Sequence, residues 1–340
     1  MSIQSTNKIH SPIIVVGRPR SGSSLFTRLL SENPDLCMIN DFYYLQYVDA
    51  LAGFDRQDST LIKSLANQIF STLKNRQKPD NLNKAGIEFG SLLNSEQTKD
   101  LKKFVDLCSA RDDLNWSSLF ATIMQYNAHL FGKKIWGYNT PQDYLHLPKL
   151  EQAFPQAKII FVMRDPRAVL RSYKYMDYLE NYHDPARYHP FLQAIAWKSA
   201  MKSFLSNQER ENFMLVKYED LVKDANRVLA EVGDFIGVNF PPVNLQSFGS
   251  NSTFKNKAKK QLSNTEIWIC EKTVGEEMQV AGYSLDNISP AREDLGYIFY
   301  VTVRSCLFYL KNAIASSDIR KRIFNLAITV LSNKNHKNYY

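Results

Sequence analysis

The chain has 340 residues, of which 44% are hydrophobic and 22% are charged, a composition close to that of ordinary globular proteins. This excludes a disordered or fibrous chain and leaves room for one or two hydrophobic cores. The 42 Lys and Arg residues outnumber the 34 Asp and Glu residues and give a net charge of +8. Such an excess suits a protein that binds anions and is too small to require nucleic acid.

The cysteine pattern predicts neither a disulfide framework nor a zinc site, because no paired Cys/His spacing occurs among Cys37, Cys108, Cys270 and Cys306. A reducing compartment fits this pattern best. The first 11 residues lead directly into a predicted strand without a secretory signal. The most apolar late stretch, residues 297–314, is interrupted by two basic residues. We therefore expect a cytoplasmic protein without a transmembrane segment.

The first predicted elements are a strand, a loop and a helix. Residues 13–16 form a short β-branched run, which is typical of a strand buried on both faces. A loop rich in Gly, Pro and Ser follows at 17–24. Apolar residues then recur at helical spacing until Asn33-Pro34 ends the helix. This order predicts the first half of a βαβ unit.

Further strands and helices alternate along the rest of the chain. The polar segment 55–125 has helical periodicity and contains no recognisable motif. Residues 158–163 form a second buried strand, which runs into Asp165-Pro166, a good N-cap and first helical residue. Residues 213–216 form a third strand, and a helical stretch follows to residue 236. The alternation predicts an α/β fold with a mostly parallel sheet.

The loop at 17–24, Gly-Arg-Pro-Arg-Ser-Gly-Ser-Ser, has the glycine spacing of a nucleotide P-loop. Backbone N–H groups at a helix N-terminus make such a loop an anion site. Ser23 stands where the P-loop has its Lys, and Arg20 supplies the cation instead. We therefore expect a ligand less charged than a nucleoside triphosphate with Mg²⁺, and no bound metal. The alternative is an ordinary strand-to-helix turn.

A second candidate anion site begins at the end of the strand at 158–163. Arg164 lies at the strand end and Ser172 lies two turns along the next helix, so that a cation and a hydroxyl together can bind a phosphate. Arg167 and Arg171, four residues apart, are expected to strengthen the positive field there, although exposed arginines are common.

These segments, together with Tyr218-Glu-Asp-Leu, resemble in their order the sulfotransferases that use 3′-phosphoadenosine 5′-phosphosulfate as donor. The likeness extends from about Pro12 to Tyr283 and is closest to bacterial and tyrosylprotein-type members, whose loop carries Pro-Arg-Ser-Gly. It implies a P-loop-like, three-layer α/β fold with a central, mostly parallel sheet flanked by helices. It also implies a sulfotransferase domain at 1–290 with a helical insertion at about 55–130. Residues 291–340 then form a basic, helical C-terminal extension, interpreted as a solvated surface helix.

The resemblance also implies roles for individual residues. The 3′-phosphate of the donor is bound by Arg164 and Ser172, with the basic segment 254–260 nearby, and Tyr218 approaches the adenine. The 5′-phosphosulfate is held by Arg20, Ser21, Gly22, Ser23 and Ser24.

This sequence departs from the family at one catalytic position. Many relatives carry Lys-Thr-Pro about 25 residues before the Arg-Asp-Pro, and that Lys touches the sulfonate. Here Asn139 replaces the Lys, so Arg20, Lys133 or Lys134 has to supply the charge. Cytosolic relatives place a His base directly after the Lys, where this chain has Thr140-Pro141, and His146 lies too far along to match.

Asp41 is the candidate general base. In tyrosylprotein-type relatives a Glu follows the first helix seven residues after its terminating Pro, and the same count from Pro34 reaches Asp41. The alternative is that Asp41 caps a helix that begins at residues 42–44. In that case His146 remains the candidate base.

We expect a sulfotransferase that moves a sulfonyl group in line to an acceptor hydroxyl or amine, with Asp41 and Arg20 as catalytic residues. The acceptor is a small molecule, a carbohydrate, a lipid or a peptide. Aromatic residues within 42–47 and 173–182 either line the acceptor pocket or belong to the core.

Two alternative functions remain. One is a P-loop kinase that binds ATP with Mg²⁺. The other is a non-catalytic nucleotide-binding or membrane-peripheral protein that uses its basic, aromatic C-terminus.

Overall fold

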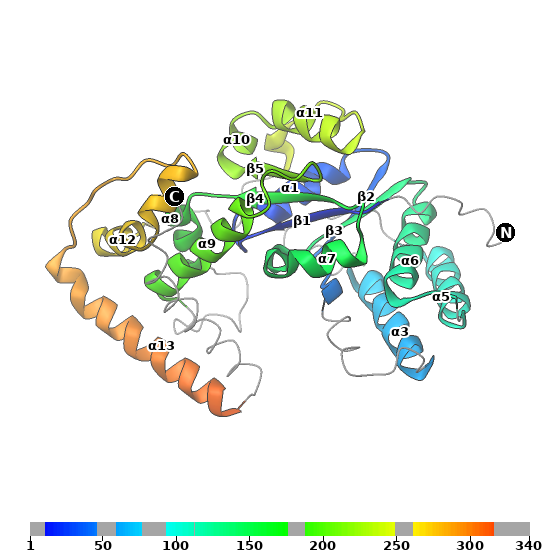
Figure 1. Cartoon of the computed structure of the whole chain (residues 1–340), viewed down its shortest axis with the longest axis horizontal. Coiled ribbons are helices and arrows are strands. Elements are labelled where there is room, and N and C mark those ends of the chain that lie inside the picture. The colour runs from blue at the N-terminus through cyan, green and yellow to red at the C-terminus, as the bar shows by residue number, and fades with distance from the viewer. Residues whose placement is uncertain are drawn as a thin grey trace. The chain divides into compact units, whose positions relative to one another are not determined.

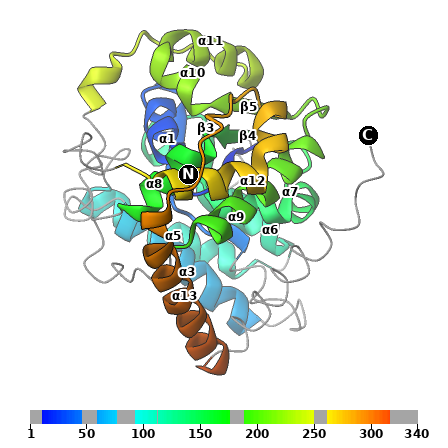
Figure 2. The same ribbon diagram turned by 90° about the vertical axis from the view of Figure 1, so that its left-hand side faces the viewer.

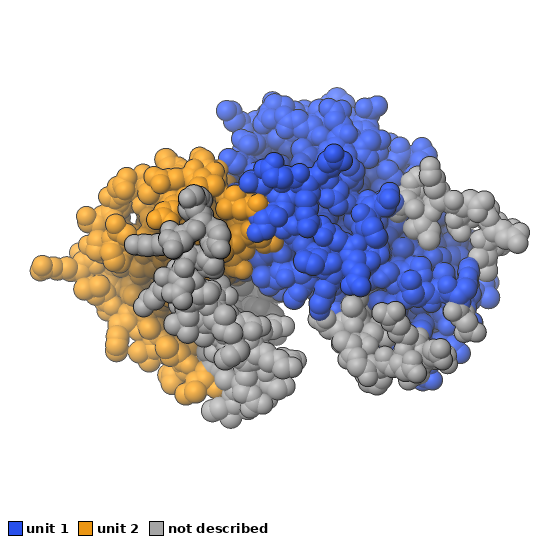
Figure 3. Space-filling view, viewed as in Figure 1, with its two compact units in different colours: residues 1–163, 206–249 blue, residues 164–205, 250–340 orange. Residues whose placement is uncertain are grey.

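The computed structural model describes residues 11–45, 59–76, 93–111, 113–175, 188–248 and 261–315. The chain divides into two compact units (Figure 3). The first comprises residues 1–163 and 206–249, and the second comprises residues 164–205 and 250–340. The domain boundary predicted near residue 290 stays a prediction.

The first unit is built on a five-stranded parallel sheet with the order β2-β3-β1-β4-β5 (Figure 1). Its strands are β1 (Ile13–Gly17), β2 (Leu36–Asn40), β3 (Ile135–Asn139), β4 (Lys158–Met163) and β5 (Phe213–Lys217). The predictions for β1, β4 and β5 are confirmed, whereas β2 and β3 were not predicted. Their sequences, Leu-Cys-Met-Ile-Asn and Ile-Trp-Gly-Tyr-Asn, lack the β-branched runs that identify the other strands.

One face of the sheet is covered by α1 (Ser23–Ser31) and α11 (Ala225–Ile236). Their apolar side chains pack against strand residues such as Val15 and Val162. Because side chains alternate along a strand, the neighbouring residues face the other way. Figure 1 shows α6 and α7 on that opposite side of the strands.

An aromatic cluster fills the opposite face. Trp136 and Tyr138 of β3 pack around Phe120, with ring centroids 5.9 and 6.2 Å from it, and Phe154 adds a fourth ring. Phe120 belongs to α6 (Trp116–Leu130), and Phe154 follows α7 (Leu147–Ala153). The unit is therefore a three-layer α/β fold, as expected.

The remaining elements of the first unit are short helices or belong to the polar segment. In its described part the polar segment holds three α-helices, as its periodicity predicts, and two of them begin after Asn residues whose side chains cap them. The elements are α3 (Ser59–Arg76), α5 (Ser95–Ser109), η2 (Pro141–His146), α10 (Tyr218–Lys223) and η4 (Leu245–Phe248), in addition to α6.

The second unit is helical in its described part. Its elements are α8 (Pro166–Lys174), α9 (Pro190–Leu205), α12 (Asn264–Val280), η7 (Arg292–Asp294) and α13 (Leu295–Ala315). The fully buried carboxylate of Glu266 on α12 accepts hydrogen bonds of 2.7 Å from Lys174 and from the Tyr188 hydroxyl. A buried carboxylate needs such partners, because burying an unpaired charge is costly. The two bonds therefore hold α8 and the chain before α9 against α12.

No helix in the described part of the chain is long and apolar enough to cross a membrane.

Candidate anion-binding site

The candidate residues of the first unit gather at the carboxyl edge of its sheet. In a parallel sheet the carboxyl ends of all strands meet at one edge, which is where α/β proteins bind ligands. The loop 17–22 follows β1, Asp41 follows β2, Thr140 follows β3 and Tyr218 follows β5.

The loop after β1 has an unusual backbone. Gly17, Arg20 and Gly22 all have positive φ, at 145°, 77° and 92°. Arg20 is not a glycine, and a side chain in this left-handed region costs about 1–3 kcal/mol, which structures tolerate chiefly at functional sites. The Ser21 N–H, between Arg20 and Gly22, donates to the Arg18 carbonyl at 3.0 Å, which closes the turn. We call residues 17–24 the cradle, because the N–H groups that follow this turn, at the start of α1, are of the kind that binds anions.

Helix α1 begins at this cradle without a side-chain cap. Its N-cap residue, Gly22, makes no side-chain hydrogen bond, and no acidic residue lies in the first turn. Helices α5, α6, α8, α11 and α12 of this chain are each capped by an Asn, Asp or Ser side chain. The first-turn amides at Ser23 and Ser24 are therefore not claimed by a cap, and the helix dipole favours an anion there.

Ser21 adds a buried polar group to the loop. Its side chain is fully buried, and its Oγ has no hydrogen-bond partner among the described residues. An unsatisfied buried hydroxyl costs about 1–3 kcal/mol. Phosphate or sulfonate oxygens in the cradle would satisfy it.

Tyr218 lies against the loop. A Cβ built on Gly22 would meet the Tyr218 ring at 2.2 Å, so the aromatic ring rests directly on the glycine backbone. Gly17 has a similar role beside β4, because an added Cβ would meet the Val162 carbonyl oxygen at 2.2 Å. The structure thus brings Tyr218 to the loop, and its contact with the adenine stays a prediction.

Asp41 is held at the end of a short amide chain. The Asn139 side chain donates to Asn40 Oδ1 (2.5 Å), and Asn40 Nδ2 donates to Asp41 Oδ2 (3.1 Å). Asn139 is fully buried and pairs with Asn40 in the β2–β3 register and with Val15 in the β3–β1 register. Asp41 therefore lies two strand spacings, roughly 10 Å, from β1 at the edge where the loop begins.

The alternative that Asp41 caps a helix beginning at residues 42–44 is wrong. The helical residues begin at Tyr44, so Tyr43 directly precedes them, and Asp41, with φ 52°, lies three residues before the helix. The Phe42 N–H instead donates to the Asn139 carbonyl. Sequence reasoning missed Asn40, since nothing local marks the end of β2.

The two lysines proposed to replace the family's Lys lie at the wrong end of the sheet. Lys133 precedes β3 and donates to the carbonyls of Ser31, Asn33 and Leu36 at 3.4, 3.0 and 2.7 Å. Burial lowers the pKa of this lysine. Lys134 pairs with Asp35 at 2.9 Å. Both residues are at the amino edge, the length of β3 away from Asn139, so neither supplies the missing charge.

His146 ends η2 and is exposed. Of the aromatic candidates, Phe42 and Tyr44 are buried in the aromatic cluster and belong to the core. Tyr43 is exposed. Tyr47, Tyr178, Tyr182 and the basic segment 254–260 lie outside the described residues.

In the second unit, Arg164 is the first residue after β4 and is 7% exposed. Its carbonyl accepts a hydrogen bond of 2.9 Å from the Trp197 indole. Ser172 lies on α8 and is 2% exposed. Helix α8 begins at Pro166 with Asp165 as its N-cap, as predicted.

The expectation that Arg167 strengthens the positive field is wrong. Its guanidinium pairs with Asp165 (2.7 Å), Glu271 (2.9 Å) and Asp286 (3.0 Å). The same Glu271 also accepts the N–H groups of Asp286 and Asn287. Three carboxylates thus surround this cation, which raises the pKa of Arg167 and makes it a structural tie between α8, α12 and the chain after α12.

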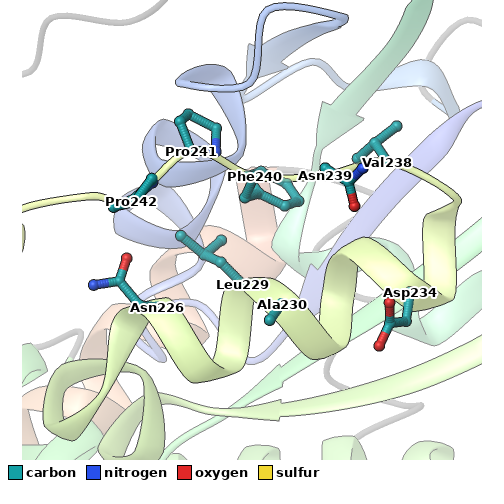
Figure 4. Close-up of a pocket in the computed structure, with 9 residues that line it drawn as sticks. All are labelled: Asn226, Leu229, Ala230, Asp234, Val238, Asn239, Phe240, Pro241 and Pro242. Carbon is teal, nitrogen blue, oxygen red and sulfur yellow. The ribbon is translucent and has the colours of Figure 1, made fainter.

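A separate pocket of about 340 Å³ lies along α11 (Figure 4). Leu229 of the helix and Phe240 of the segment after it line the pocket, with Asn226 and Asp234 also on its wall. None of its lining residues belongs to the candidate site.

Among the residues that the structure describes, no group of three or more His, Cys, Asp or Glu side chains is placed to hold a metal ion.

Comparison with known proteins points to one family. A model of the sulfotransferase family matches residues 12–242. Human sulfotransferase 2A1 is 30% identical over 137 residues, which are 36% of this chain and 47% of the human protein. The 3-beta-hydroxysteroid sulfotransferase of Cavia porcellus is 26% identical over 132 residues, which are 36% of this chain and 46% of that protein. The chain thus spans about half the length of the curated relatives it matches.

A solved structure also resembles the chain. The sulfotransferase domain of the Synechococcus PCC 7002 olefin synthase has 18% identity and a TM-score of 0.48, and the likeness covers 84% of this chain and 99% of that domain. The family model spans most of the chain, including the loop after β1, the Arg164 segment and Tyr218. The chain belongs to the sulfotransferase family.

Proposed function

We propose that this chain is a sulfotransferase that uses 3′-phosphoadenosine 5′-phosphosulfate as donor. The observation that carries the proposal is the cradle at 17–24, in which an uncapped helix N-terminus, left-handed turns and an unsatisfied buried hydroxyl meet. This combination suits a tetrahedral anion.

In this proposal the donor is divided between two sets of residues. Arg20 and Ser21, with the amides of residues 22–24, hold the 5′-phosphosulfate, and Tyr218 contacts the adenine. Arg164 and Ser172 hold the 3′-phosphate. When bound, the donor supplies the sulfonyl group and leaves as adenosine 3′,5′-bisphosphate.

Asp41 takes the proton of the acceptor hydroxyl or amine as that oxygen or nitrogen bonds to sulfur. The S–O bond to the phosphate breaks in the same step, and the cradle amides with Arg20 stabilise the charge left on the phosphate oxygen. Asn40 positions Asp41, because its amide donates to Oδ2 of the carboxylate. Asn139 in turn fixes the orientation of the Asn40 amide.

The donor assignment is tested by thermal unfolding with two ligands. Adenosine 3′,5′-bisphosphate is expected to raise the melting temperature, while ATP with Mg²⁺ does little, because only a ligand that binds the native state stabilises it. Equal stabilisation by ATP would favour the kinase alternative. Stabilisation by the bisphosphate without turnover of any acceptor would favour a non-catalytic nucleotide-binding protein.

The base is tested by Asp41→Asn, which keeps the shape of the side chain and removes its ability to accept a proton. Transfer is expected to fall by roughly 10²–10⁴-fold with bisphosphate affinity unchanged. Asp113→Asn, at a 65% exposed carboxylate in a loop, is the matched control. Near-normal turnover in Asp41→Asn would return the role to His146 or to an acceptor that needs no base.

The positioning role of Asn40 has its own readout. Asn40→Asp places a second carboxylate beside Asp41, and a neighbouring like charge raises a carboxyl pKa. The acid limb of the pH–rate profile is therefore expected to move to higher pH. An unshifted profile with a uniformly lower rate would mean that Asn40 only supports the fold.

The acceptor is proposed from the names of the relatives. Because one relative is named as a 3-beta-hydroxysteroid sulfotransferase, hydroxysteroids are the first acceptors to assay. Carbohydrate, lipid and peptide acceptors complete the screen, with isotope-labelled donor and mass spectrometry as the readout.

A further inference from the structure

Helix α13 presents an apolar face that the donor and acceptor chemistry does not use. Figures 1 and 2 show it as one continuous helix. Of the 13 large apolar side chains that the described residues leave exposed, seven lie on α13. Exposed apolar side chains gathered in this way mark interaction surfaces rather than ordinary solvent contact.

Six of these seven side chains form one stripe, and Tyr297 lies outside it. At 100° per residue the six cover an arc of about 140° on the helix surface. Phe299, Leu310 and Leu307 are 72%, 61% and 60% exposed, so most of the stripe is open to solvent. The stripe consists of Leu295, Phe299, Tyr300, Val303, Leu307 and Leu310.

The opposite side of α13 is attached to its own unit. On that side Val301 and Ser305 are 2% exposed, and next to the Leu295 edge of the stripe the Thr302 hydroxyl lies 3.0 Å from His189 Nε2. The helix therefore has a fixed inner face, and the stripe is its outer face.

Both charged residues of α13 are basic and lie beside the stripe. Arg304 and Lys311 fall within about 40° of its edge at 100° per residue. The Arg304 guanidinium donates to the Tyr300 hydroxyl at 2.7 Å and lies 5.6 Å from that ring. An apolar stripe bordered by a tyrosine and cations is the pattern of helices that lie in a membrane interface.

A second copy of the chain fits this face less well. A parallel symmetric pair of α13 helices would bring Arg304 and Lys311 near their own counterparts, and α13 contains no acidic residue to compensate them. Anionic headgroups would neutralise both cations while the stripe enters the acyl boundary. The sequence beyond the helix adds Arg320, Lys321 and Arg322 but is not part of the proposed surface.

We propose that α13 binds the surface of an anionic lipid bilayer, lying in the interface with its apolar stripe inserted and Arg304 and Lys311 at the headgroups. The inference is independent of the transfer reaction.

Cys306 offers a direct probe, since it lies within the arc of the stripe and is the exposed member of the four cysteines. Burial raises the pKa of the Cys37 and Cys270 thiols to about 12 and that of Cys108 to about 11, so these react poorly. A solvent-sensitive fluorophore on Cys306 of the full chain is expected to shift to the blue with vesicles of phosphatidylcholine containing phosphatidylglycerol. It should change little with pure phosphatidylcholine, and added salt should reverse the shift.

Substitutions separate the apolar contribution to vesicle binding from the electrostatic one. The vesicle affinity of each unlabelled chain is measured by sedimentation. Leu307→Glu is expected to weaken vesicle binding at least tenfold, because it removes an apolar side chain that enters the bilayer and adds a negative charge that anionic headgroups repel. Arg304→Gln is expected to weaken it about fivefold. Leu107→Glu, at a 57% exposed leucine on α5, is the matched control and should bind normally.

Vesicle binding that is equal for Leu307→Glu and the unmodified chain would overturn the proposal. So would a concentration-dependent dimer that Leu307→Glu abolishes while no vesicle binds, because the face would then be a contact between copies. Leu307 and Leu107 are exposed and Arg304 is half-buried, and melting temperatures check that each variant is folded.

Discussion

In the loop after β1 the groups proposed to hold an anion are main-chain amides joined by the Arg20 and Ser21 side chains, whereas at Arg164 and in α8 they are side chains alone. The loop needs only glycine at 17 and 22, a left-handed Arg20 and a helix that lacks a cap. In the second segment, three arginines lie within eight residues, and the surroundings of Arg164 and Arg167 differ. Arg164 is buried at the strand end, while Arg167 is surrounded by carboxylates from residues about 100 positions away. A backbone site is thus encoded locally, whereas the charge available at a side-chain site depends on distant partners.

The largest effect should come from the backbone site. Gly22→Ala puts a Cβ 2.2 Å from the Tyr218 ring at φ 92°, so the ring and the loop amides must move apart. The loss of the loop geometry and of one or two charge-assisted hydrogen bonds should cost about 3–4 kcal/mol of binding free energy. Bisphosphate binding is therefore expected to weaken a hundred- to thousandfold, as measured by calorimetric titration.

Gly132→Ala is the control for this substitution, because Gly132 also has positive φ (68°) but nothing lies within 4 Å of the added Cβ. It carries the backbone strain without the collision. If both glycine variants bind the bisphosphate equally well, the cradle does not bind the anion.

Arg164→Ala should have the next largest effect on the same titration. A charge-assisted hydrogen bond is worth about 1.5–3 kcal/mol, so the affinity is expected to fall about ten- to a few hundredfold. An unchanged affinity would show that Arg164 supports the fold and does not bind the 3′-phosphate.

Arg167→Ala sharpens the contrast between the two arginines. Removing this cation leaves Glu271 and Asp165 without their shared partner, which should cost about 2–3 kcal/mol of stability and lower the melting temperature by several degrees. The bisphosphate affinity should change less than threefold, in the opposite pattern to Arg164→Ala. A loss of affinity equal to that of Arg164→Ala would mean that its charge reaches the ligand after all.

Local patterns in the sequence predicted β1, β4, β5 and the caps of α8, because these depend on β-branched runs and on an Asp-Pro pair. They missed β2 and β3, whose strand character comes from pairing within the sheet, β3 with β1 and β2 with β3, rather than from their residues. The mistaken role of Lys133 has the same cause. Only the sheet register shows that Lys133 and Asn139 lie at opposite ends of one strand.

The candidate site shows the same difference between features that a local pattern encodes and features that strand pairing creates. Ser21 and Tyr218 could be named from motifs, and the structure places the Tyr218 ring on the loop. The Asn139–Asn40–Asp41 chain could not, because it joins two strands nearly 100 residues apart.

The smallest effect compares two buried hydroxyls, one in each segment. The Ser21 hydroxyl has no partner among the described residues, so Ser21→Ala should stabilise the ligand-free protein by up to about 1 kcal/mol while weakening bisphosphate binding a few-fold. Ser172→Ala removes a hydroxyl from the interior of α8, so any loss of affinity should come without a gain in stability. Melting temperatures with and without bisphosphate measure both quantities in one experiment. If Ser21→Ala lowers the melting temperature of the free protein, the hydroxyl is already satisfied there, and the cradle is a structural turn rather than an anion site.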